Sequence, residues 1–177
     1  TLKQKIAQEV SEMVANGHRT PHLVAILVGN DGGSQTYVAA KEKACHEVGF
    51  GGTVIRYDQT ITEEQLLVKI AEINADQEID GLIVQLPLPK HINETKITHA
   101  ILPEKDVDGF HSENIGKLMQ NKSHLRPCTP KGVMTILSSI DCKVIGMNCV
   151  VVGASNIVGR PMAMELLNAR GTVTICN

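Results

Sequence analysis

Aromatic side chains are scarce in this chain of 177 residues, which has no tryptophan, two tyrosines and two phenylalanines. Its hydrophobic fraction is nevertheless 42%, which is sufficient for a folded core. That core must therefore consist mainly of aliphatic side chains. The hydrophobic residues never form a run of about 18, the length that a membrane-spanning helix needs. Residues 1–17 have the spacing of an amphipathic helix rather than of a signal peptide.

The chain also lacks an excess of charge of either sign. Its net charge is -2, and nucleic acids and acidic membranes bind surfaces that are strongly basic, so neither is an expected partner. The five cysteines are odd in number and form no Cys-x-x-Cys pair, and the seven histidines show no paired-ligand spacing. The sequence therefore predicts no metal site and reduced thiols in a cytoplasm.

Hydrophobic periodicity predicts helices and strands in alternation. Helical spacing covers residues 2–16, 34–48, 62–74, 94–102 and 130–140, and a further helix ends near residue 169. Short apolar runs at 22–28, 53–57, 80–85, 148–152 and 172–176 predict strands. This order indicates an α/β fold with parallel sheets. Thr62 and Gln65 have the spacing of a capping box, and Thr129 before Pro130 predicts an N-cap. The stretch Leu86-Pro-Leu-Pro89 is a candidate for a cis X-Pro bond.

Polar side chains follow several of the predicted strands. Tyr37 and Lys41 lie four residues apart in a predicted helix, so they share one of its faces. Gln85 ends a strand, and Asp106 and Asp108 stand in a loop that closes with glycine. Ligands of open parallel sheets bind at the carboxyl ends of the strands. A lysine that loses solvation in such a cleft has a lowered pKa and exchanges protons near neutral pH.

Each of these residues has a chemical and a structural explanation. A neutral amide such as Gln85 orients an amine without holding it as an ammonium ion, and the two oxygens of an aspartate accept two parallel N–H donors of a heterocycle. Alternatively, the lysine stem covers the tyrosine ring at the surface, Gln85 bonds backbone, and Asp108 opens a turn. Composition and spacing alone indicate no more than an α/β enzyme that uses a cofactor.

A glycine turn near the end of the chain predicts a nucleotide site. Gly153 to Gly159 follows a strand and opens a helix, and a second strand comes next, as in mononucleotide-binding units. The turn reads G-x-S-x-x-x-G rather than the usual G-x-G-x-x-G. Asn177 stands where an acidic residue would hold the ribose of NAD, which favours NADP. A turn that only packs a helix on a sheet is the structural alternative.

Five stretches together carry a closer likeness, and they span essentially the whole chain. They are Tyr37-Val-Ala-Ala-Lys41-x-Lys-Ala-Cys, Gly81-Leu-Ile-Val-Gln85-Leu-Pro-Leu-Pro, Pro103-Glu-Lys-Asp-Val-Asp108-Gly, Arg126-Pro-Cys-Thr-Pro-Lys-Gly132 and Val152-Gly-Ala-Ser-Asn-Ile-Val-Gly-Arg-Pro-Met162. In this order they resemble the bifunctional methylenetetrahydrofolate dehydrogenase/methenyltetrahydrofolate cyclohydrolase family.

The resemblance implies two α/β domains with the active site between them. Residues 1–127 would form a folate-binding catalytic domain with a largely parallel sheet, and residues 128–177 the first part of a Rossmann-type NADP-binding domain. The implied enzyme oxidises 5,10-methylenetetrahydrofolate with NADP+ and hydrolyses the methenyl product to 10-formyltetrahydrofolate, within one-carbon metabolism. The resemblance also implies a homodimer formed through the Rossmann-type domain.

The resemblance further implies roles for individual residues. Lys41 matches the catalytic lysine, Gln85 the residue that positions it, Tyr37 the ring that stacks on the aminobenzoyl group, and Asp108 the carboxylate that grips the pterin. These four are the predicted catalytic residues. Leu86 and Pro87 join them as predicted substrate-binding residues, and the predicted NADP contacts are Gly153, Ala154, Ser155, Ile157, Val158, Gly159, Arg160 and Pro161.

Members of that family continue beyond the position that matches Asn177, with further strands and a terminal helix. The expectation is therefore a fragment of a longer protein. An alternative is a folate-binding or dimerising fragment without dehydrogenase activity, because half a dinucleotide site is missing. Another alternative, a Rossmann oxidoreductase acting on an amino or hydroxy acid, would not require the set Tyr37, Lys41, Gln85 and Asp108.

Overall fold

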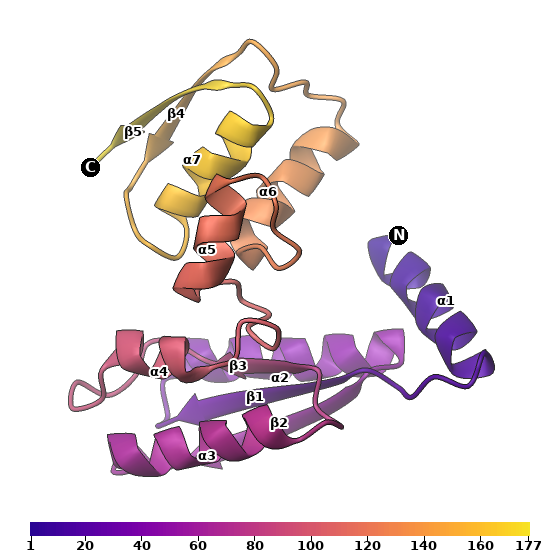
Figure 1. The fold of residues 1–177 in the computed structure, drawn as a ribbon, viewed down its shortest axis with the longest axis vertical. Coiled ribbons are helices and arrows are strands. Elements are labelled where there is room, and N and C mark those ends of the chain that lie inside the picture. The colour runs from indigo at the N-terminus through magenta and orange to yellow at the C-terminus, as the bar shows by residue number, and fades with distance from the viewer. The chain divides into compact units, whose positions relative to one another are not determined.

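The computed structural model describes residues 1–177, which divide into two compact units, Thr1–Lys105 and Asp106–Asn177. Both units combine helices with parallel strands, so the predicted α/β class is confirmed (Figure 1). None of the helices has the length and apolar character that crossing a membrane requires.

The first unit is built around one central strand. Its elements are α1 (Leu2–Ala15), β1 (His22–Val28), α2 (Gly32–Val48), β2 (Gly51–Tyr57), α3 (Glu63–Ala75), β3 (Gly81–Val84) and α4 (Glu94–Ala100). The sheet order is β2-β1-β3, and both neighbours of β1 run parallel to it. The five residues from Val24 to Val28 are all buried, as an uninterrupted apolar run in a central parallel strand predicts.

Successive side chains of β1 serve opposite faces of the sheet, because side chains alternate along a strand. Val24, Ile26 and Val28 join a cluster with residues of α3 and α4, and Ala25 and Leu27 pack with Val38 of α2. Figure 1 shows the sheet with α2 on the face away from α3. Both clusters are aliphatic, as the scarcity of aromatic residues required. Each fully buried side chain of this kind stabilises the fold by about 1.5–3 kcal/mol.

Local capping interactions fix the ends of the helices around this sheet. The side chain of Asp31 accepts a hydrogen bond of 2.8 Å from the backbone N–H of Ser34, which lowers the pKa of Asp31 and starts α2 at Gly32. The capping box of Thr62 and Gln65 is confirmed, with hydrogen bonds of 3.2 Å and 3.0 Å. Helix α2, which carries two predicted site residues, is therefore anchored at its first turn.

A surface ion pair joins the chain segments that precede β1 and β3. Arg19 donates to both carboxylate oxygens of Asp80 at 2.7 Å, and Asp80 also accepts from the backbone N–H of His22 at 2.8 Å. The hydrogen bond from Arg19 lowers the pKa of Asp80 more than any other interaction does. Asp80 therefore links the start of the central strand to the start of its neighbour.

We expect Asp80→Asn to reduce the free energy of unfolding by about 0.5–1 kcal/mol near pH 7, since both partners are partly exposed and solvent screens them. The folded pKa of Asp80 lies below its unfolded value of about 3.9, so this stabilisation is present above that pH and is lost as pH falls through the folded pKa. Urea unfolding near pH 7 and near pH 2.5 measures the difference. Exposed Glu104, changed to Gln, is the control, and an equal loss at both pH values would contradict the prediction.

The second unit places its helices on one face of a small sheet. Its elements are α5 (Ser112–Met119), α6 (Cys128–Ser139), β4 (Asn148–Val152), α7 (Gly159–Asn168) and β5 (Thr172–Cys176). Strands β4 and β5 are parallel, and a cluster of Val144, Met162 and Leu166 packs with residues of α6, β4 and β5. On the other face of the sheet, Val150 and Val152 are 65% and 84% exposed.

One predicted helix start is wrong. The sequence suggested Thr129 as the N-cap of α6, but the helix begins at Cys128, and its N-cap Pro127 makes no side-chain hydrogen bond. Pro130 consequently lies at the third helical position, where a missing N–H costs nothing because the first four N–H groups have no partner in the helix. The other helices and strands with predicted limits fall within about two residues of them, the usual scatter at element ends, whereas α5 had no predicted limits.

Candidate active site

Lys41 and Gln85 meet at the carboxyl end of the first sheet. Lys41 lies on α2, which follows β1, and Gln85 directly follows β3. The backbone N–H of Gln85 donates to the carbonyl of Ile26 at 2.9 Å, which extends the strand pairing and keeps Gln85 beside β1. The lysine Nζ donates to Gln85 Oε1 at 3.1 Å. Parallel neighbouring strands thus bring together two side chains that are 44 positions apart in the chain.

The orientation of the Gln85 amide is fixed from its other end. Its Nε2 donates to the carbonyl of Leu86 at 2.9 Å, which leaves Oε1 to accept from Lys41. Gln85 therefore bonds to the backbone, as its structural explanation stated, and also contacts the lysine amine, as its chemical explanation stated. Because the amide is neutral, it directs the lysine amine without pairing with it as a carboxylate would. The next peptide bond, Leu86–Pro87, is cis.

Tyr37 precedes Lys41 by one turn of α2, and it is 67% exposed. The buried residues Ser34 and Val38 have the i, i+3, i+4, i+7 spacing with Tyr37 and Lys41, so they lie on an adjoining part of the same side of the helix. Tyr37 therefore lies at the edge of the buried side of α2, where its exposed ring is available for stacking on a planar ligand, and Lys41 is half-buried. Of the two other predicted substrate contacts, Leu86 is half-buried and Pro87 is exposed.

The two aspartates of the loop 106–109 have different surroundings in the second unit. Asp106 is 2% exposed, and both of its carboxylate oxygens accept hydrogen bonds from within the chain. Asp108 is half-buried. Sequence position alone did not separate these residues as ligands for a heterocycle. Both carboxylate oxygens of Asp106 are engaged within the chain, and Asp108 as the ligand for a heterocycle stays a prediction.

The glycine turn between β4 and α7 is held in place by Ser155 and by close backbone packing. Ser155 Oγ accepts from the backbone N–H groups of Val158 and Gly159, each at 3.2 Å. A Cβ on Gly159 would lie 2.0 Å from the carbonyl oxygen of Gly153, so no side chain fits there. Arg160 Nε donates to the carbonyl of Ala154 at 3.1 Å, which lays the guanidinium along the turn.

This turn fits the phosphates of a nucleotide. Residues 155–158 are exposed in front of α7, a helix of 10 residues, and the amino end of a helix attracts anions. Small residues at positions 153 and 154 allow a phosphate to approach the backbone closely. Five of the eight predicted contacts lie in the turn, and Gly159 and Arg160 are the first two residues of α7. The eighth, Pro161, has a fully buried side chain.

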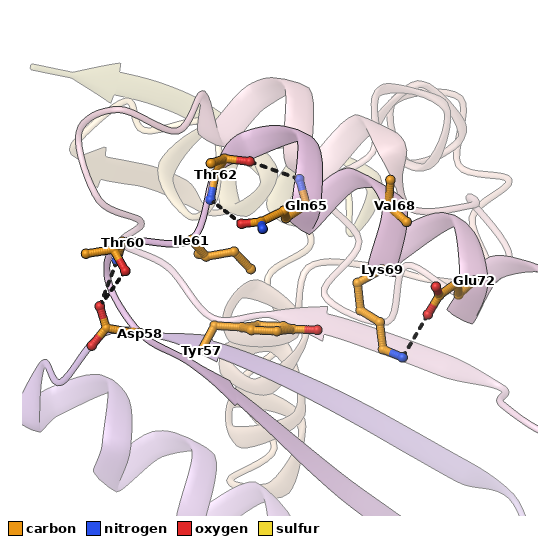
Figure 2. Close-up of a pocket in the computed structure, with 9 residues that line it drawn as sticks. All are labelled: Tyr57, Asp58, Thr60, Ile61, Thr62, Gln65, Val68, Lys69 and Glu72. Carbon is orange, nitrogen blue, oxygen red and sulfur yellow. Dashed lines mark hydrogen bonds and ion pairs between the residues drawn. The ribbon is translucent and has the colours of Figure 1, made fainter.

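A separate groove of 710 Å³ lies between the end of β2 and α3 (Figure 2). Its polar side chains pair with one another: Asp58 accepts from Thr60, Thr62 exchanges hydrogen bonds with Gln65, and Lys69 pairs with Glu72. None of the predicted site residues lines it. Sequence reasoning did not find this groove, and its satisfied polar groups give it no chemical character that marks a catalytic site.

These features define an α/β protein with a lysine–amide pair at strand ends and a nucleotide-type turn. The chain belongs to the tetrahydrofolate dehydrogenase/cyclohydrolase family: the family's catalytic domain matches residues 1–108, and its NAD(P)-binding domain matches residues 127–177. The compact units divide after Lys105, so residues 106–108 match the catalytic-domain model but pack with the second unit, and residues 109–126 match neither model. The predicted boundary after residue 127 stays a prediction.

Relatives and solved structures agree with this family. The bifunctional protein FolD of Ruthia magnifica is 59% identical over 176 residues, which are 99% of this chain and 64% of that protein. The bifunctional FolD enzyme of Campylobacter jejuni has 43% identity and a TM-score of 0.95 over 98% of this chain and 62% of its own. The Trypanosoma brucei FolD structure, complexed with NADP cofactor and an inhibitor, has 32% identity and a TM-score of 0.93 over 98% and 60%. The chain thus spans less than two thirds of the length of these relatives.

Proposed function

We propose that the protein oxidises 5,10-methylenetetrahydrofolate with NADP+ and hydrolyses the resulting methenyl cation to 10-formyltetrahydrofolate. Membership of the family supports this activity. The observation that carries it is the hydrogen bond of 3.1 Å between Lys41 and Gln85, because it places an amine, directed by a neutral amide, at the carboxyl end of a parallel sheet. The alternatives of an isolated folate-binding role or of an amino or hydroxy acid substrate give this pair no task.

In the oxidation, NADP+ supplies the hydride acceptor when it is bound. The turn from Gly153 to Gly159 would hold its phosphates at the amino end of α7. Tyr37 would support the aminobenzoyl ring by stacking, and Asp108 would accept two N–H donors of the pterin. Loss of a hydride from the methylene carbon of the folate leaves the cation that the hydrolysis consumes.

In the hydrolysis, water adds to the methenyl carbon and releases a proton. The bond from that carbon to N5 then breaks, N5 takes up a proton, and the hydroxyl proton is lost as the formyl carbonyl forms. One proton is released overall. Lys41 is the residue that takes a proton from the water and returns one to N5, and Gln85 keeps its amine directed at the carbon.

We further propose a cofactor, an oligomeric state and a cellular location for the protein. The family description covers both NAD and NADP. The cofactor is NADP rather than NAD, since Asn177 provides no carboxylate for a free ribose hydroxyl. The protein acts as a homodimer, and it acts in the cytoplasm. Competition between the two nucleotides in one binding assay, and the sedimentation of the purified protein, test the first two.

The experiment that tests the proposal uses a polypeptide whose mass confirms residues 1–177. We expect both NADP+-dependent oxidation of methylenetetrahydrofolate and methenyl hydrolysis in the same cuvette. Hydrolysis without NADP+ reduction would show that the folate site works but that hydride transfer needs more chain than these residues supply. A folded protein with neither activity and no folate binding would overturn the proposal.

A further inference from the structure

Asp106 is a carboxylate enclosed by the loop to which it belongs. Its Oδ1 accepts from the backbone N–H of Gly109 at 3.0 Å, and its Oδ2 accepts from the backbone N–H of His111 at 2.8 Å and from Asn114 Nδ2 at 2.9 Å. With 2% of its surface exposed, it depends on these three neutral donors in place of water. It therefore ties the loop both to itself and to the start of α5.

Such a buried charge is more than a turn requires. Asparagine, serine or an exposed aspartate closes an ordinary turn, and burial of a carboxylate is unfavourable unless its oxygens are fully bonded. Buried ionic groups that are fully bonded restrict the chain to one geometry, and this restriction is their best-supported benefit. The arrangement around Asp106 consequently indicates that the exact course of the loop 106–109 matters.

The two residues that flank Asp108 are each held from outside the loop. A Cβ on Gly109 would lie 2.7 Å from backbone atoms of Arg126 and Pro127, so the loop rests directly on that segment, and Gly109 has a φ of +71° that suits glycine. On the other side, the thiol of Cys128 donates to the carbonyl of Val107 at 3.3 Å. Asp108 is thus presented between two fixed backbone positions.

The supporting segment 126–128 is itself connected to the nucleotide-type helix. Arg126 Nη1 donates to Glu165 Oε2 of α7 at 3.1 Å, and Glu165 is 4% exposed. Arg126 Nε and Glu165 Oε1 are buried without a hydrogen-bond partner. An ion pair that leaves polar groups unsatisfied is a poor source of stability, so it too acts by fixing position.

We propose that Asp106 is a positioning residue for folate binding: by fixing Gly109 and the start of α5, it sets the direction in which Asp108 presents its carboxylate. This inference rests on the proposed function, in which Asp108 grips the pterin. Two parallel hydrogen bonds need both carboxylate oxygens in the plane of the heterocycle. A loop that must be ordered at each binding event binds more weakly, because the ordering opposes association.

The test compares Asp106→Asn with Asp108→Asn in the protein as it exists. An asparagine at position 106 turns an amide N–H toward the donors that surround the carboxylate, so the loop must move. We expect the KM for methenyltetrahydrofolate to rise about tenfold or more, with kcat changed less than about threefold, since a pterin contact far from the reacting carbon affects binding rather than the chemical step. The Kd for NADP+ should stay within about twofold, because the turn 153–159 is untouched.

Asp141→Asn is the matched control, since it makes the same chemical change at an exposed position of the same unit. Should Asp106→Asn fail to fold, Asn114→Ala removes one of the three donors and should raise the KM about threefold with unchanged NADP+ affinity. An unchanged KM, or NADP+ affinity lost in parallel with folate affinity, would show a merely structural role and overturn the inference. If Asp108→Asn leaves the KM unchanged, the pterin assignment fails, whereas an effect of Asp108→Asn alone overturns only the role of Asp106.

Discussion

Lys41→Met is expected to lower the rate of methenyltetrahydrofolate hydrolysis by about 10²–10⁴, the usual contribution of a positioned acid–base group. Methionine keeps most of the length and apolar stem of lysine, so α2 and its buried side should be unaffected. Hydride transfer needs no proton from this residue, and dehydrogenase activity should therefore fall much less. Stopped assays of both activities on one preparation give the ratio of hydrolase to dehydrogenase activity.

Lys43→Met is the control for this prediction. Lys43 lies two residues further along α2, its side chain is 78% exposed, and its ion pair with Glu47 spans 3.9 Å, so its loss should change neither activity. Equal losses of hydrolysis and oxidation in Lys41→Met would indicate a shared binding role rather than proton transfer. Full hydrolysis in that variant would remove Lys41 from the mechanism.

Gly159→Ala is expected to remove NADP+ binding. The new Cβ would need the space 2.0 Å from the carbonyl oxygen of Gly153, so the two ends of the turn must separate. Ser155 would then lose its contacts with the backbone N–H groups at positions 158 and 159. If two hydrogen bonds to a phosphate are lost with the turn, at about 1.5–3 kcal/mol each, the Kd rises at least about a hundredfold. Calorimetric titration with NADP+ measures this change.

Two glycines in helices of the same unit provide matched controls. Nothing lies within 4 Å of a Cβ built on Gly116 or on Gly132. Alanine at either position should leave NADP+ binding unchanged and should stabilise its helix by about 0.5–1 kcal/mol, since it restricts the unfolded chain. If Gly159→Ala binds NADP+ like the unchanged protein, the turn is not the nucleotide site. An equal loss of NADP+ binding in the two control variants would indicate that any substitution in the helices of this unit disturbs binding.

Much of this fold was predictable because its determinants are local. The apolar run His22–Val28 and the capping box at Thr62 specify their elements without distant partners. The meeting of Lys41 with Gln85 also followed from a general rule, since neighbouring parallel strands end at the same edge of a sheet. The motifs themselves supplied the family, and the matching models agree with it.

Other features depend on contacts between distant segments and left no local signal. Composition and spacing do not distinguish Asp106 from Asp108, whereas the structure shows that Asp106 is buried and accepts hydrogen bonds from Gly109, His111 and Asn114. The start of α6 was misplaced for a related reason: Thr129 is a good N-cap by residue type, but the turn leading into the helix is set by Pro127 and Cys128, which pack against the loop 106–109. The groove beside β2 likewise results from how α3 covers the sheet.

The support of the loop 106–109 by residues 126–128 also bears on the recombination of related genes. A chimera joined after residue 127 would take the loop from one parent and Cys128 from the other, so the thiol contact with Val107 would cross parental boundaries. A junction after Lys105 inherits the loop together with the segment 126–128 that contacts Val107 and Gly109. Exchange at that point should therefore transfer the loop 106–109 and the turn 153–159 together, whichever parent supplies the preceding sheet.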